Sequence, residues 1–284
     1  MAEISKAVLI TGCSTGIGRA TAERLAAKGH TVYATARRPE TIADLLDKGC
    51  KALALDVTDE DSMRAAVAAV ERAEGAVGAL INNAGYSQSG AVESLDLDAV
   101  RRQFETNVFG LVRMCQLALP GMRRQGHGRI VNISSIGGKL VFPGGGAYHG
   151  TKHAVEAFSD ALRFEVKGFG VDVVVIEPGL IKTEFANAAT AALSDGAAAD
   201  GPYAKFNGAV GSLTAGAYER GPAAMLGGGP ERVAKAIEKA IVKRRPKVRS
   251  KVTPSAHIVL GQRALFTDRM WDAFVGTQFK RPRA

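Results

Sequence analysis

The side chains best suited to chemistry are a phenol and an amine, Tyr148 and Lys152, four residues apart in a predicted helix over residues 147–168. Residues at i and i+4 share one helix face, so the two groups are expected to lie close together. A free tyrosine, with a pKa of about 10, is a poor acid or base at neutral pH. A nearby ammonium favours the phenolate and brings its proton transfer into a useful range. Such pairs are common on helices, so this one gains weight only from the residues around it.

A hydroxyl group is expected beside this pair. Ser135 follows a predicted strand over residues 128–134 and is placed to hydrogen-bond the oxygen of a reacting group. The adjacent Ser134 should point the other way, because side chains alternate along an extended segment. The sequence thus predicts a phenol, an ammonium and a hydroxyl around one substrate oxygen.

A glycine-rich turn near the N-terminus predicts a cofactor site. It follows an apolar segment, residues 6–11, that is typical of a buried strand, and a helix is predicted over residues 19–28. Glycine lets a phosphate approach the main chain, and a helix N-terminus offers free N–H groups and partial positive charge to a pyrophosphate. This strand–turn–helix context favours dinucleotide binding over a purely structural turn. The candidate binding residues of the turn are Gly12, Ser14, Thr15, Gly16, Ile17 and Gly18.

The end of the second predicted strand, residues 31–36, bears on which dinucleotide is bound. A carboxylate there would bind the ribose 2′-hydroxyl of NAD(H). Here Arg37 and Arg38 follow instead, and guanidinium groups suit a 2′-phosphate. NADP(H) is therefore expected in preference to NAD(H). The alternative is that both arginines merely face solvent.

A third cofactor contact is expected at Asp56 and Val57, which follow the predicted strand over residues 51–55. Their position after a strand end places them to contact the adenine ring. Asp56 equally suits a cap for the helix that follows.

Short apolar segments alternate with longer amphipathic segments over the first 180 residues. Strands that are apolar on both faces and separated by helices predict a parallel sheet covered on both sides. Right-handed crossovers then give a single doubly wound α/β domain spanning residues 1–284, with ligands beyond the carboxyl ends of the strands. The predicted strands are 6–11, 31–36, 51–55, 79–82, 128–134 and 171–177, and the predicted helices are 19–28, 39–48, 59–74, 97–124 and 147–168.

Taken together, these motifs resemble the short-chain dehydrogenase/reductase family of the classical type. The resemblance covers residues 6–185 and rests on the order and spacing of the segments 11–18 and 82–85, Asn107, Ser135, Tyr148-x-x-x-Lys152 and Pro178-Gly179. It implies a Rossmann domain in which Tyr148 is the general acid/base and Lys152 binds the nicotinamide ribose and lowers the pKa of Tyr148. It also implies that Ser135 stabilises the reacting oxygen and that Asn107 holds a water in a proton relay to Lys152.

The same resemblance implies the remaining cofactor contacts and the function. Besides Tyr148 and Lys152, the implied cofactor-binding residues are Asn83, Ala84, Gly85, Pro178, Gly179 and Thr183. The implied reaction moves a hydride between NADP(H) and a small-molecule alcohol or carbonyl. Residues 32–39 and the basic C-terminal end resemble members acting on lipophilic steroid-, retinoid- or ketone-like substrates. A homodimer or homotetramer is usual in the family.

The alternative function is a dinucleotide-binding sensor or scaffold with little catalysis, because fold does not fix function. Such a protein tolerates loss of the tyrosine or the lysine, and this chain keeps both Tyr148 and Lys152. An enzyme is therefore the favoured prediction.

Composition excludes several other classes. The three cysteines, Cys13, Cys50 and Cys115, match no zinc spacing and no disulfide framework, so no metal site is expected. The N-terminus does not resemble a signal peptide, and the chain lacks an apolar stretch of about 20 residues. A cytoplasmic, reducing location is therefore expected. A thiol inside the cofactor turn, Cys13, also raises the prospect of an oxidation-sensitive loop.

The C-terminal third departs from the alternating pattern. Residues 186–230 are rich in Ala and Gly and predict a flexible substrate loop or lid. Residues 231–284 carry 14 Lys and Arg against 4 Asp and Glu. This basic extension predicts a helix over 230–243, an edge strand over 247–252 and an amphipathic helix over 255–275. A solvated basic edge is the favoured interpretation and contact with a membrane surface is the alternative; no nucleic acid is expected.

Overall fold

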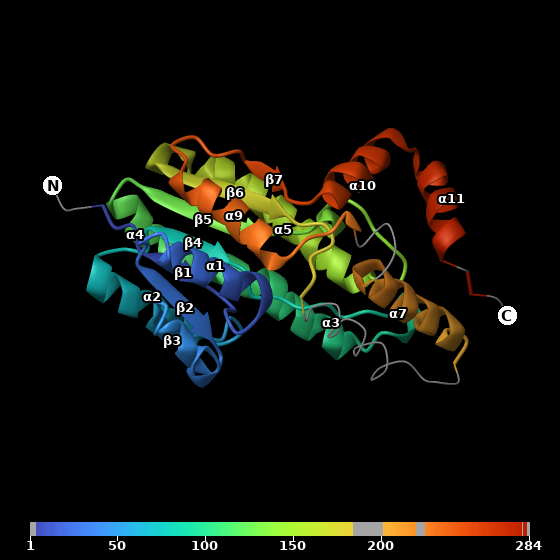
Figure 1. The fold of residues 1–284 in the computed structure, drawn as a ribbon, viewed down its shortest axis with the longest axis horizontal. Coiled ribbons are helices and arrows are strands. Elements are labelled where there is room, and N and C mark those ends of the chain that lie inside the picture. Colours follow the sequence, from blue (N-terminus) through green and yellow to red (C-terminus); the bar gives the residue numbers. More distant parts are fainter. Residues whose placement is uncertain (1–3, 184–200, 220–224, 280, 283–284) are drawn as a thin grey trace.

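Within the residues that the computed structural model describes (4–183, 201–219, 225–279 and 281–282), seven parallel strands form one sheet in the order β3–β2–β1–β4–β5–β6–β7 (Figure 1). The order reverses between β1 and β4, which confirms the doubly wound arrangement. The strands are β1 (Val8–Ile10), β2 (Val32–Ala36), β3 (Lys51–Ala54), β4 (Ala79–Asn82), β5 (Gly128–Ile133), β6 (Val171–Glu177) and β7 (Arg249–Lys251).

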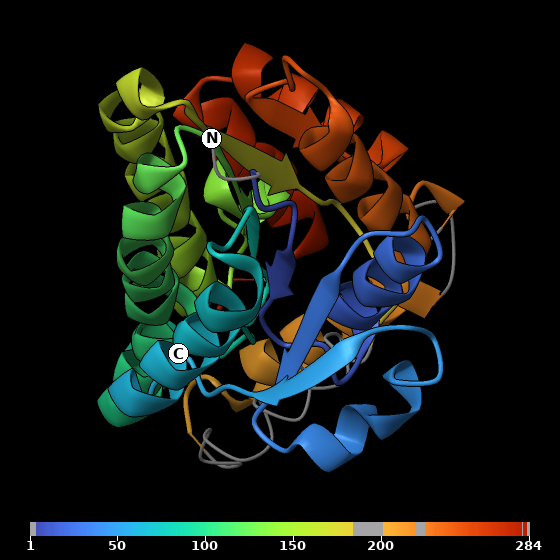
Figure 2. The same cartoon turned by 90° about the vertical axis from the view of Figure 1, so that its left-hand side faces the viewer.

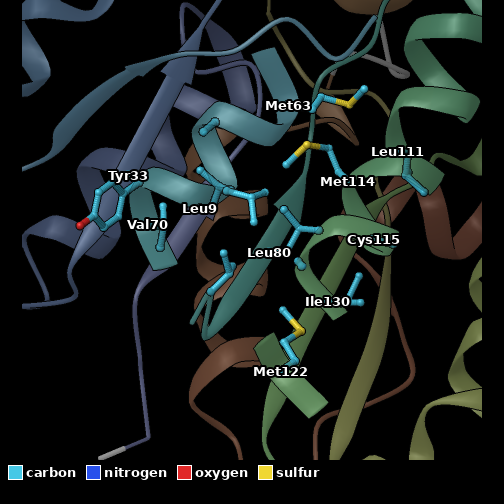
Figure 3. Close-up of a cluster of buried hydrophobic side chains, with 14 of the residues drawn as sticks. Leu9, Tyr33, Met63, Val70, Leu80, Leu111, Met114, Cys115, Met122 and Ile130 are labelled. Carbon is cyan, nitrogen blue, oxygen red and sulfur yellow. The ribbon is translucent and has the colours of Figure 1, made fainter. Parts of the chain in front are cut away.

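Both faces of the sheet are covered, because successive residues of strands β1 to β6 are apolar and point to opposite sides. In β1, Leu9 packs into one hydrophobic cluster, while Val8 and Ile10 pack into the other. Figure 3 shows the first cluster, where Leu9 and Leu80 meet side chains of the covering helices. Strands β1 to β6 therefore each contribute to two cores, as a sheet buried on both sides requires, whereas the polar edge strand β7 contributes to neither.

Helices lie on both sides of the sheet, as Figure 2 shows. The first side holds α2 (Glu60–Glu74), α4 (Gly110–Arg124) and α5 (Gly146–Glu165), each of which contributes buried apolar side chains to the cluster with Leu9. The second side holds α1 (Gly16–Ala26) and α9 (Pro230–Val242), each of which contributes buried apolar side chains to the cluster with Val8. No helix among the described residues is long and apolar enough to span a membrane.

Two predicted helices have a different form in the structure. The long helix expected over residues 97–124 consists of α3 (Leu97–Phe104), a π-helical turn η3 (Glu105–Phe109) and α4. The helix expected over residues 39–48 is a 3₁₀ segment, η1 (Pro39–Leu45), because the backbone of Ile42 leaves the helical region at φ −127° and ψ 17°. The spacing of apolar residues alone does not reveal these changes from an α-helix to a π-helical turn or a 3₁₀ segment.

The remaining short elements connect the larger ones. They are the 3₁₀ turns η2 (Val92–Ser94), η4 (Ile136–Gly138) and η5 (Lys167–Phe169). η4 begins directly after Ser135. The helix expected over residues 147–168 ends as α5 at Glu165, and the 3₁₀ turn η5 follows it. The turn η4 matters for the site because it fixes the direction of the chain after β5.

The single helix expected over residues 255–275 is wrong: two helices occupy the segment, α10 (Pro254–Leu265) and α11 (Asp268–Gln278). The chain is extended at Phe266, with φ −88° and ψ 135°, and the Thr267 hydroxyl then accepts a hydrogen bond from the Met270 N–H as the cap of α11. A threonine cap inside an apolar pattern ends one helix and begins another. The edge strand expected nearby is confirmed as β7, at the end of the sheet.

The two C-terminal helices build a third hydrophobic cluster. Trp271 of α11 packs beside Phe142, with ring centroids 5.7 Å apart, and its indole N–H donates to the Val141 carbonyl at 3.2 Å. Leu140 and Leu260 are buried in the same cluster. The cluster therefore joins the C-terminal end to the segment that follows Ser135.

The loop expected over residues 186–230 contains a helix that the sequence did not predict, α7 (Ala204–Glu219). Its first turns dock on the body of the protein, since Asn207 Oδ1 accepts a hydrogen bond from the Ala91 N–H at 3.1 Å and Val210 is buried. The rest of the expected lid, residues 186–200 and 220–224, lies outside the described residues.

Candidate active site

The loops that follow the strands meet at the carboxyl edge of the sheet. The turn after β1 contacts the loop after β4, because a Cβ added to Gly12 would lie 3.0 Å from the Ala84 Cα. It also faces the loop after β6, because a Cβ on Gly16 would lie 3.4 Å from the Thr183 methyl group. Three loops far apart in the sequence therefore surround one site, as a parallel sheet requires.

Glycine is required in the turn after β1 by its backbone and by its neighbours. Gly12 and Gly16 have φ values of +72° and +59°, which other residues rarely adopt. A Cβ on Gly18 would lie 2.2 Å from the Gly12 carbonyl oxygen and 2.5 Å from Asn83 Nδ2. The turn therefore leaves a close, side-chain-free approach to its main chain.

The N-terminus of α1 fits a pyrophosphate. Thr15 is the cap residue, but its side chain makes no capping hydrogen bond. The first N–H groups of the helix are therefore left to bind a ligand, in the partial positive field of the helix dipole. Ser14 and Thr15 are exposed, and Ile17 is half-buried behind the turn. These features match a dinucleotide phosphate group in both charge and space.

Arg37 and Arg38 lie beside this turn. The Cys13 N–H donates to the Thr35 carbonyl at 2.7 Å, which holds the glycine turn against the end of β2. Both arginine side chains are exposed, and neither forms an ion pair with any described residue. Two free guanidinium groups thus lie at the position where a carboxylate would select NAD(H).

The alternative role of Asp56 as a helix cap is wrong. Asp56 Oδ1 accepts hydrogen bonds from the Thr58 N–H at 2.9 Å and the Thr58 hydroxyl at 2.7 Å. The cap of α2 is Asp59, which accepts from the Asp61 and Ser62 N–H groups. Val57 is buried, and its carbonyl oxygen would lie 2.4 Å from a Cβ on Gly110. Asp56 therefore shapes the loop rather than the helix.

The loop after β4 is tied to the glycine turn by reciprocal hydrogen bonds. Asn83 Nδ2 donates to the carbonyls of Thr11 and Gly12 at 3.0 and 2.9 Å. The Thr11 hydroxyl accepts from the N–H groups of Asn83 and Ala84, both at 3.0 Å. Thr11 was not predicted as a site residue, although its place at the end of β1, just before the glycines, is the available signal.

Tyr148 and Lys152 lie together in the first turns of α5. The Lys152 ammonium is 5.7 Å from the centroid of the Tyr148 ring and donates to the Ile133 carbonyl at 2.8 Å. Burial lowers the pKa of Lys152 to about 8, and the nearby Glu156 carboxylate opposes that shift. The lysine is thus a buried cation next to a phenol, which is the arrangement that favours a phenolate.

Ser135 lies across from this pair, at the start of η4. Its hydroxyl oxygen accepts from the Gly137 N–H at 3.1 Å. A Cβ on Gly137 would lie 3.5 Å from Tyr148 Cε1, so the serine turn and the phenol ring are neighbours. Ser134 is buried and its hydroxyl lies 2.7 Å from the Cβ position of Gly138, whereas Ser135 is half-buried. The opposite orientation of the two serine side chains stays a prediction.

Asn107 occupies the π-helical turn between α3 and α4. Its Oδ1 accepts from the Tyr86 N–H at 3.0 Å, and its Nδ2 donates to the Tyr86 carbonyl at 2.9 Å and to the Thr151 hydroxyl at 3.1 Å. A Cβ on Gly85 would lie 3.0 Å from Asn107 Oδ1. Asn107 therefore fastens the loop after β4 to the helix that carries Lys152. Turns of this kind are frequent at functional sites.

Thr151 is a second residue that the sequence analysis missed. Its hydroxyl accepts from Asn107 and donates to the Tyr148 carbonyl at 2.7 Å. Its position between Tyr148 and Lys152 is the only signal that the sequence offered. Thr151 holds the first turn of α5 in register with the π-helical turn.

The loop after β6 packs against α10. A Cβ on Gly179 would lie 2.4 Å from the Thr253 hydroxyl oxygen, and the Leu180 N–H donates to the Ser255 hydroxyl at 3.2 Å. Pro178 is buried in the same loop, and its carbonyl accepts from the Ile136 N–H at 3.0 Å. The loop after β6 is thus braced by the C-terminal segment.

The expected oxidation sensitivity of Cys13 is not supported. The thiol is fully buried, and burial raises its pKa to about 12. A thiol with so high a pKa is unreactive at neutral pH. Across the described residues, no group of three or more His, Cys, Asp or Glu side chains is arranged to hold a metal ion.

Comparison with known proteins agrees with this geometry. Residues 6–194 match the model of the short chain dehydrogenase family. A 3-ketodihydrosphingosine reductase from Bacteroides thetaiotaomicron is 43% identical over 179 residues, which are 63% of this chain and 65% of that protein. An NADPH-dependent 3-dehydrocapnine reductase from Ornithobacterium rhinotracheale is 33% identical over 284 residues, 96% of this chain and 97% of that one.

A solved structure extends the likeness to the fold. The crystal structure of a short-chain dehydrogenase from Streptomyces avermitilis superimposes with a TM-score of 0.78 and 35% identity, covering 93% of each chain. The family match covers two thirds of the chain and includes every loop of the site described above except the contacts from α7 and α10. The chain therefore belongs to the short-chain dehydrogenase family of oxidoreductases.

Proposed function

We propose that this enzyme transfers a hydride between NADP(H) and the carbonyl or alcohol carbon of a lipophilic small molecule. The observation that carries the proposal is the grouping of Tyr148, Lys152 and Ser135 at the same edge of the sheet as the glycine turn. A phenol next to a buried ammonium moves a proton, and a dinucleotide in the turn would place its nicotinamide at the same edge of the sheet.

Each catalytic role follows from a contact. Ser135 holds the substrate oxygen by a hydrogen bond from its hydroxyl, while Tyr148 gives its Oη proton to that oxygen during reduction. Lys152 stabilises the resulting phenolate, because its ammonium lies 5.7 Å from the ring centroid in a buried setting. When bound, the nicotinamide supplies the hydride that reaches the carbonyl carbon. Asn107 keeps the helix start and the neighbouring loop in place for a proton relay to Lys152.

The choice of NADP(H) over NAD(H) is supported by Arg37 and Arg38. Both guanidinium groups are exposed beside the glycine turn and lack ion-pair partners among the described residues. A 2′-phosphate accepts charge-assisted hydrogen bonds from such groups. The relative that reduces 3-dehydrocapnine is itself described as NADPH-dependent.

A lipophilic substrate is supported by the third hydrophobic cluster, against which Ile136, the residue after Ser135, packs. Phe142 lies 6.2 Å from the ring of His149, next in sequence to Tyr148, and Trp271 and Phe279 pack against Phe142 from the C-terminal end. Burial lowers the pKa of His149 to about 4, so His149 carries no charge at neutral pH. The relatives named as reductases of a 3-keto and a 3-dehydro compound support the carbonyl as the reacting group.

A panel of alcohols and ketones of graded hydrophobicity, assayed with NADPH and NADH side by side, tests the proposal. Turnover is expected with NADPH and to rise with substrate hydrophobicity. Tight NADPH binding without turnover of any panel member would favour the sensor or scaffold alternative. Homodimer or homotetramer assembly and a cytoplasmic location stay predictions, to be measured by light scattering and by imaging of a tagged chain.

A further inference from the structure

Glu156 is a buried carboxylate on the helix that carries Tyr148 and Lys152. It follows Lys152 by four residues in α5, so the two side chains share one face of the helix. Only 4% of its side chain is exposed. A carboxylate in the interior is costly unless charged or polar groups surround it. Glu156 has no part in the reaction proposed above, so its surroundings have to explain why it is there.

Two cations from different elements bind this carboxylate. Lys139 Nζ, directly after η4, lies 3.0 Å from Glu156 Oε2, and Arg249 Nε of β7 lies 3.0 Å from the same oxygen. Glu156 Oε1 is buried and has no hydrogen-bond partner among the described residues. The carboxylate therefore joins η4 and β7 to α5.

The Lys139 side of this ion pair belongs to the turn that carries Ser135. The Gly138 N–H donates to the Ser135 carbonyl at 3.0 Å, and Lys139 follows next in the chain. A Cβ on Gly138 would lie 2.9 Å from Glu156 Cγ and 3.0 Å from the Lys152 carbonyl oxygen. The turn thus packs directly on the helix between Lys152 and Glu156, and the ion pair fastens it there.

Glu156 also acts on Lys152 through its charge. Burial lowers the pKa of Lys152 to about 8, and the Glu156 carboxylate opposes that shift. The Lys152 ammonium in turn lies 5.7 Å from the centroid of the Tyr148 ring. The neighbouring His149 is uncharged above pH 6, because burial lowers its pKa to about 4. Charges in the interior are weakly screened, so a carboxylate one helical turn away bears on both proton-carrying groups.

The other charged groups around Glu156 come from β6 and from α5 itself. Glu177 Oε1 of β6 lies 3.3 Å from Arg249 Nε; burial raises the pKa of Glu177, and the Glu156 charge adds to that effect. Asp160, one turn further along α5, accepts from Arg249 Nη2 at 2.5 Å. Farther out lie Arg163, beside Asp160, and Lys251, near Glu177. Arg249 thus serves three carboxylates, whereas Lys139 forms an ion pair only with Glu156 within the part of the chain that the structure describes.

We propose that Glu156 is a positioning residue for the hydride transfer, an inference that rests on the function proposed above. Through Lys139 it holds the turn of Ser135 against the helix of Tyr148 and Lys152. Its negative charge stabilises the Lys152 ammonium and disfavours the Tyr148 phenolate. Carbonyl reduction uses the phenol and the ammonium in their protonated forms, so this charge extends reduction to higher pH.

Two single substitutions separate the charge of Glu156 from the mere presence of an ion pair. Glu156→Gln removes a negative charge, so the Tyr148–Lys152 pair should lose its proton at lower pH. Lys139→Gln removes a positive charge, so the pair should keep its proton to higher pH. Both variants break the same ion pair, and a purely structural role would move both in one direction.

The measurement is the alkaline limb of kcat/KM for carbonyl reduction between pH 6 and pH 10.5. It should move down by about 0.5–1 pH unit in Glu156→Gln and up, by a smaller amount, in Lys139→Gln, whose side chain is partly exposed. Displacement of both limbs in the same direction, or of neither, would refute the role of the Glu156 charge.

The value of kcat tests the support given to Ser135. Glu156→Gln and Lys139→Gln should each lower kcat at the optimal pH by about tenfold, because the turn loses its fastening to α5. Lys139→Arg keeps the charge and the ion pair and should behave as the wild type. The matched control is Asp160→Asn, which removes a carboxylate that binds Arg249 from the same helix but has no ion pair with the turn. It should change kcat by less than about twofold, and a loss equal to that of Glu156→Gln would refute the proposed support.

Direct titration of the phenol separates a failure of this inference from a failure of the proposed function. The near-ultraviolet absorbance of the phenolate, measured in each variant and in its Tyr148→Phe counterpart, gives the ionisation midpoint of Tyr148 without any turnover. The same opposite displacements are expected in Glu156→Gln and Lys139→Gln. If they occur but the wild type reduces no substrate, the proposed function is wrong and the charge effect stands. If the wild type is active and the midpoints coincide, the role of Glu156 is wrong. Melting temperatures verify folding, and Lys139→Gln against Lys139→Arg carries the test if Glu156→Gln does not fold.

Discussion

Arg249 of β7 and Glu156 of α5 form an ion pair, with Arg249 Nε 3.0 Å from Glu156 Oε2, across 93 residues of sequence. Glu156 lies one helical turn beyond Lys152, and Lys139 holds it from the other side at 3.0 Å. The same Arg249 Nε lies 3.3 Å from Glu177 Oε1. One arginine from the C-terminal segment therefore forms ion pairs with two buried carboxylates, one of them a helical turn from Lys152 of the proposed catalytic pair.

Replacing this arginine should destabilise the fold. Arg249→Met leaves Glu156 and Glu177 buried with less positive charge, a loss of about 3 kcal/mol in the free energy of unfolding. Burial and the Glu156 charge raise the pKa of Glu177, so the folded protein favours its protonated form and loses stability as pH rises through that pKa. The loss in the free energy of unfolding caused by Arg249→Met should thus be smaller at pH 5 than at pH 8, as measured by urea denaturation. Arg263→Gln, whose partner Asp268 is exposed, is the control and should cost much less.

Removing the phenol should stop the reaction without emptying the cofactor site. Tyr148→Phe is expected to lower kcat by about 10²–10⁴-fold, because it removes the proposed proton donor to the substrate oxygen. NADPH affinity, followed by nicotinamide fluorescence, should change little. Retained turnover would remove Tyr148 from the proton transfer.

The Lys152 charge should set the pH profile. With a pKa of about 8 for Lys152, the ammonium is present below that pH and is lost above it. In Lys152→Met the phenolate loses this support, so the pKa of Tyr148 should rise and the pH optimum for alcohol oxidation should move upward. The profile of kcat/KM from pH 6 to pH 10.5 tests this. A Lys152→Met profile that coincides with the wild type would contradict it.

Cofactor preference should depend on the two exposed arginines. Arg37→Gln/Arg38→Gln should weaken NADPH binding by about 10–100-fold, as expected from losing charge-assisted hydrogen bonds to a phosphate. NADH binding should stay within about twofold, because NADH has no 2′-phosphate. Titration of NADPH and NADH into the variant and into the wild type measures these affinities. If the wild-type protein binds NADH more tightly than NADPH, the proposed role of both arginines is wrong.

The glycine turn should tolerate no side chain at its centre. In Gly18→Ala the new methyl group would meet the Gly12 carbonyl oxygen at 2.2 Å, so the turn must shift. NADPH binding should weaken by more than about tenfold, and the melting temperature should fall. Gly276→Ala, in α11 with nothing within 4 Å of its added Cβ, is the control and should be neutral or slightly stabilising.

The sequence by itself determined the sheet, its covering helices and most of the candidate site. Apolar strands between amphipathic helices admit few arrangements, and the glycine turn, Ser135 and the Tyr148–Lys152 pair each lie at a strand end or a helix start. These are local patterns, with periods of two or of about 3.6 residues, that a single segment reveals.

Only the tertiary structure decided the rest. The π-helical turn around Asn107 and the docking of α7 through Asn207 depend on partners far along the chain. The pairing of Arg249 with Glu156 is of the same kind. The energies that fix such features are packing and ion pairing between distant segments, and no local pattern of residue types encodes them.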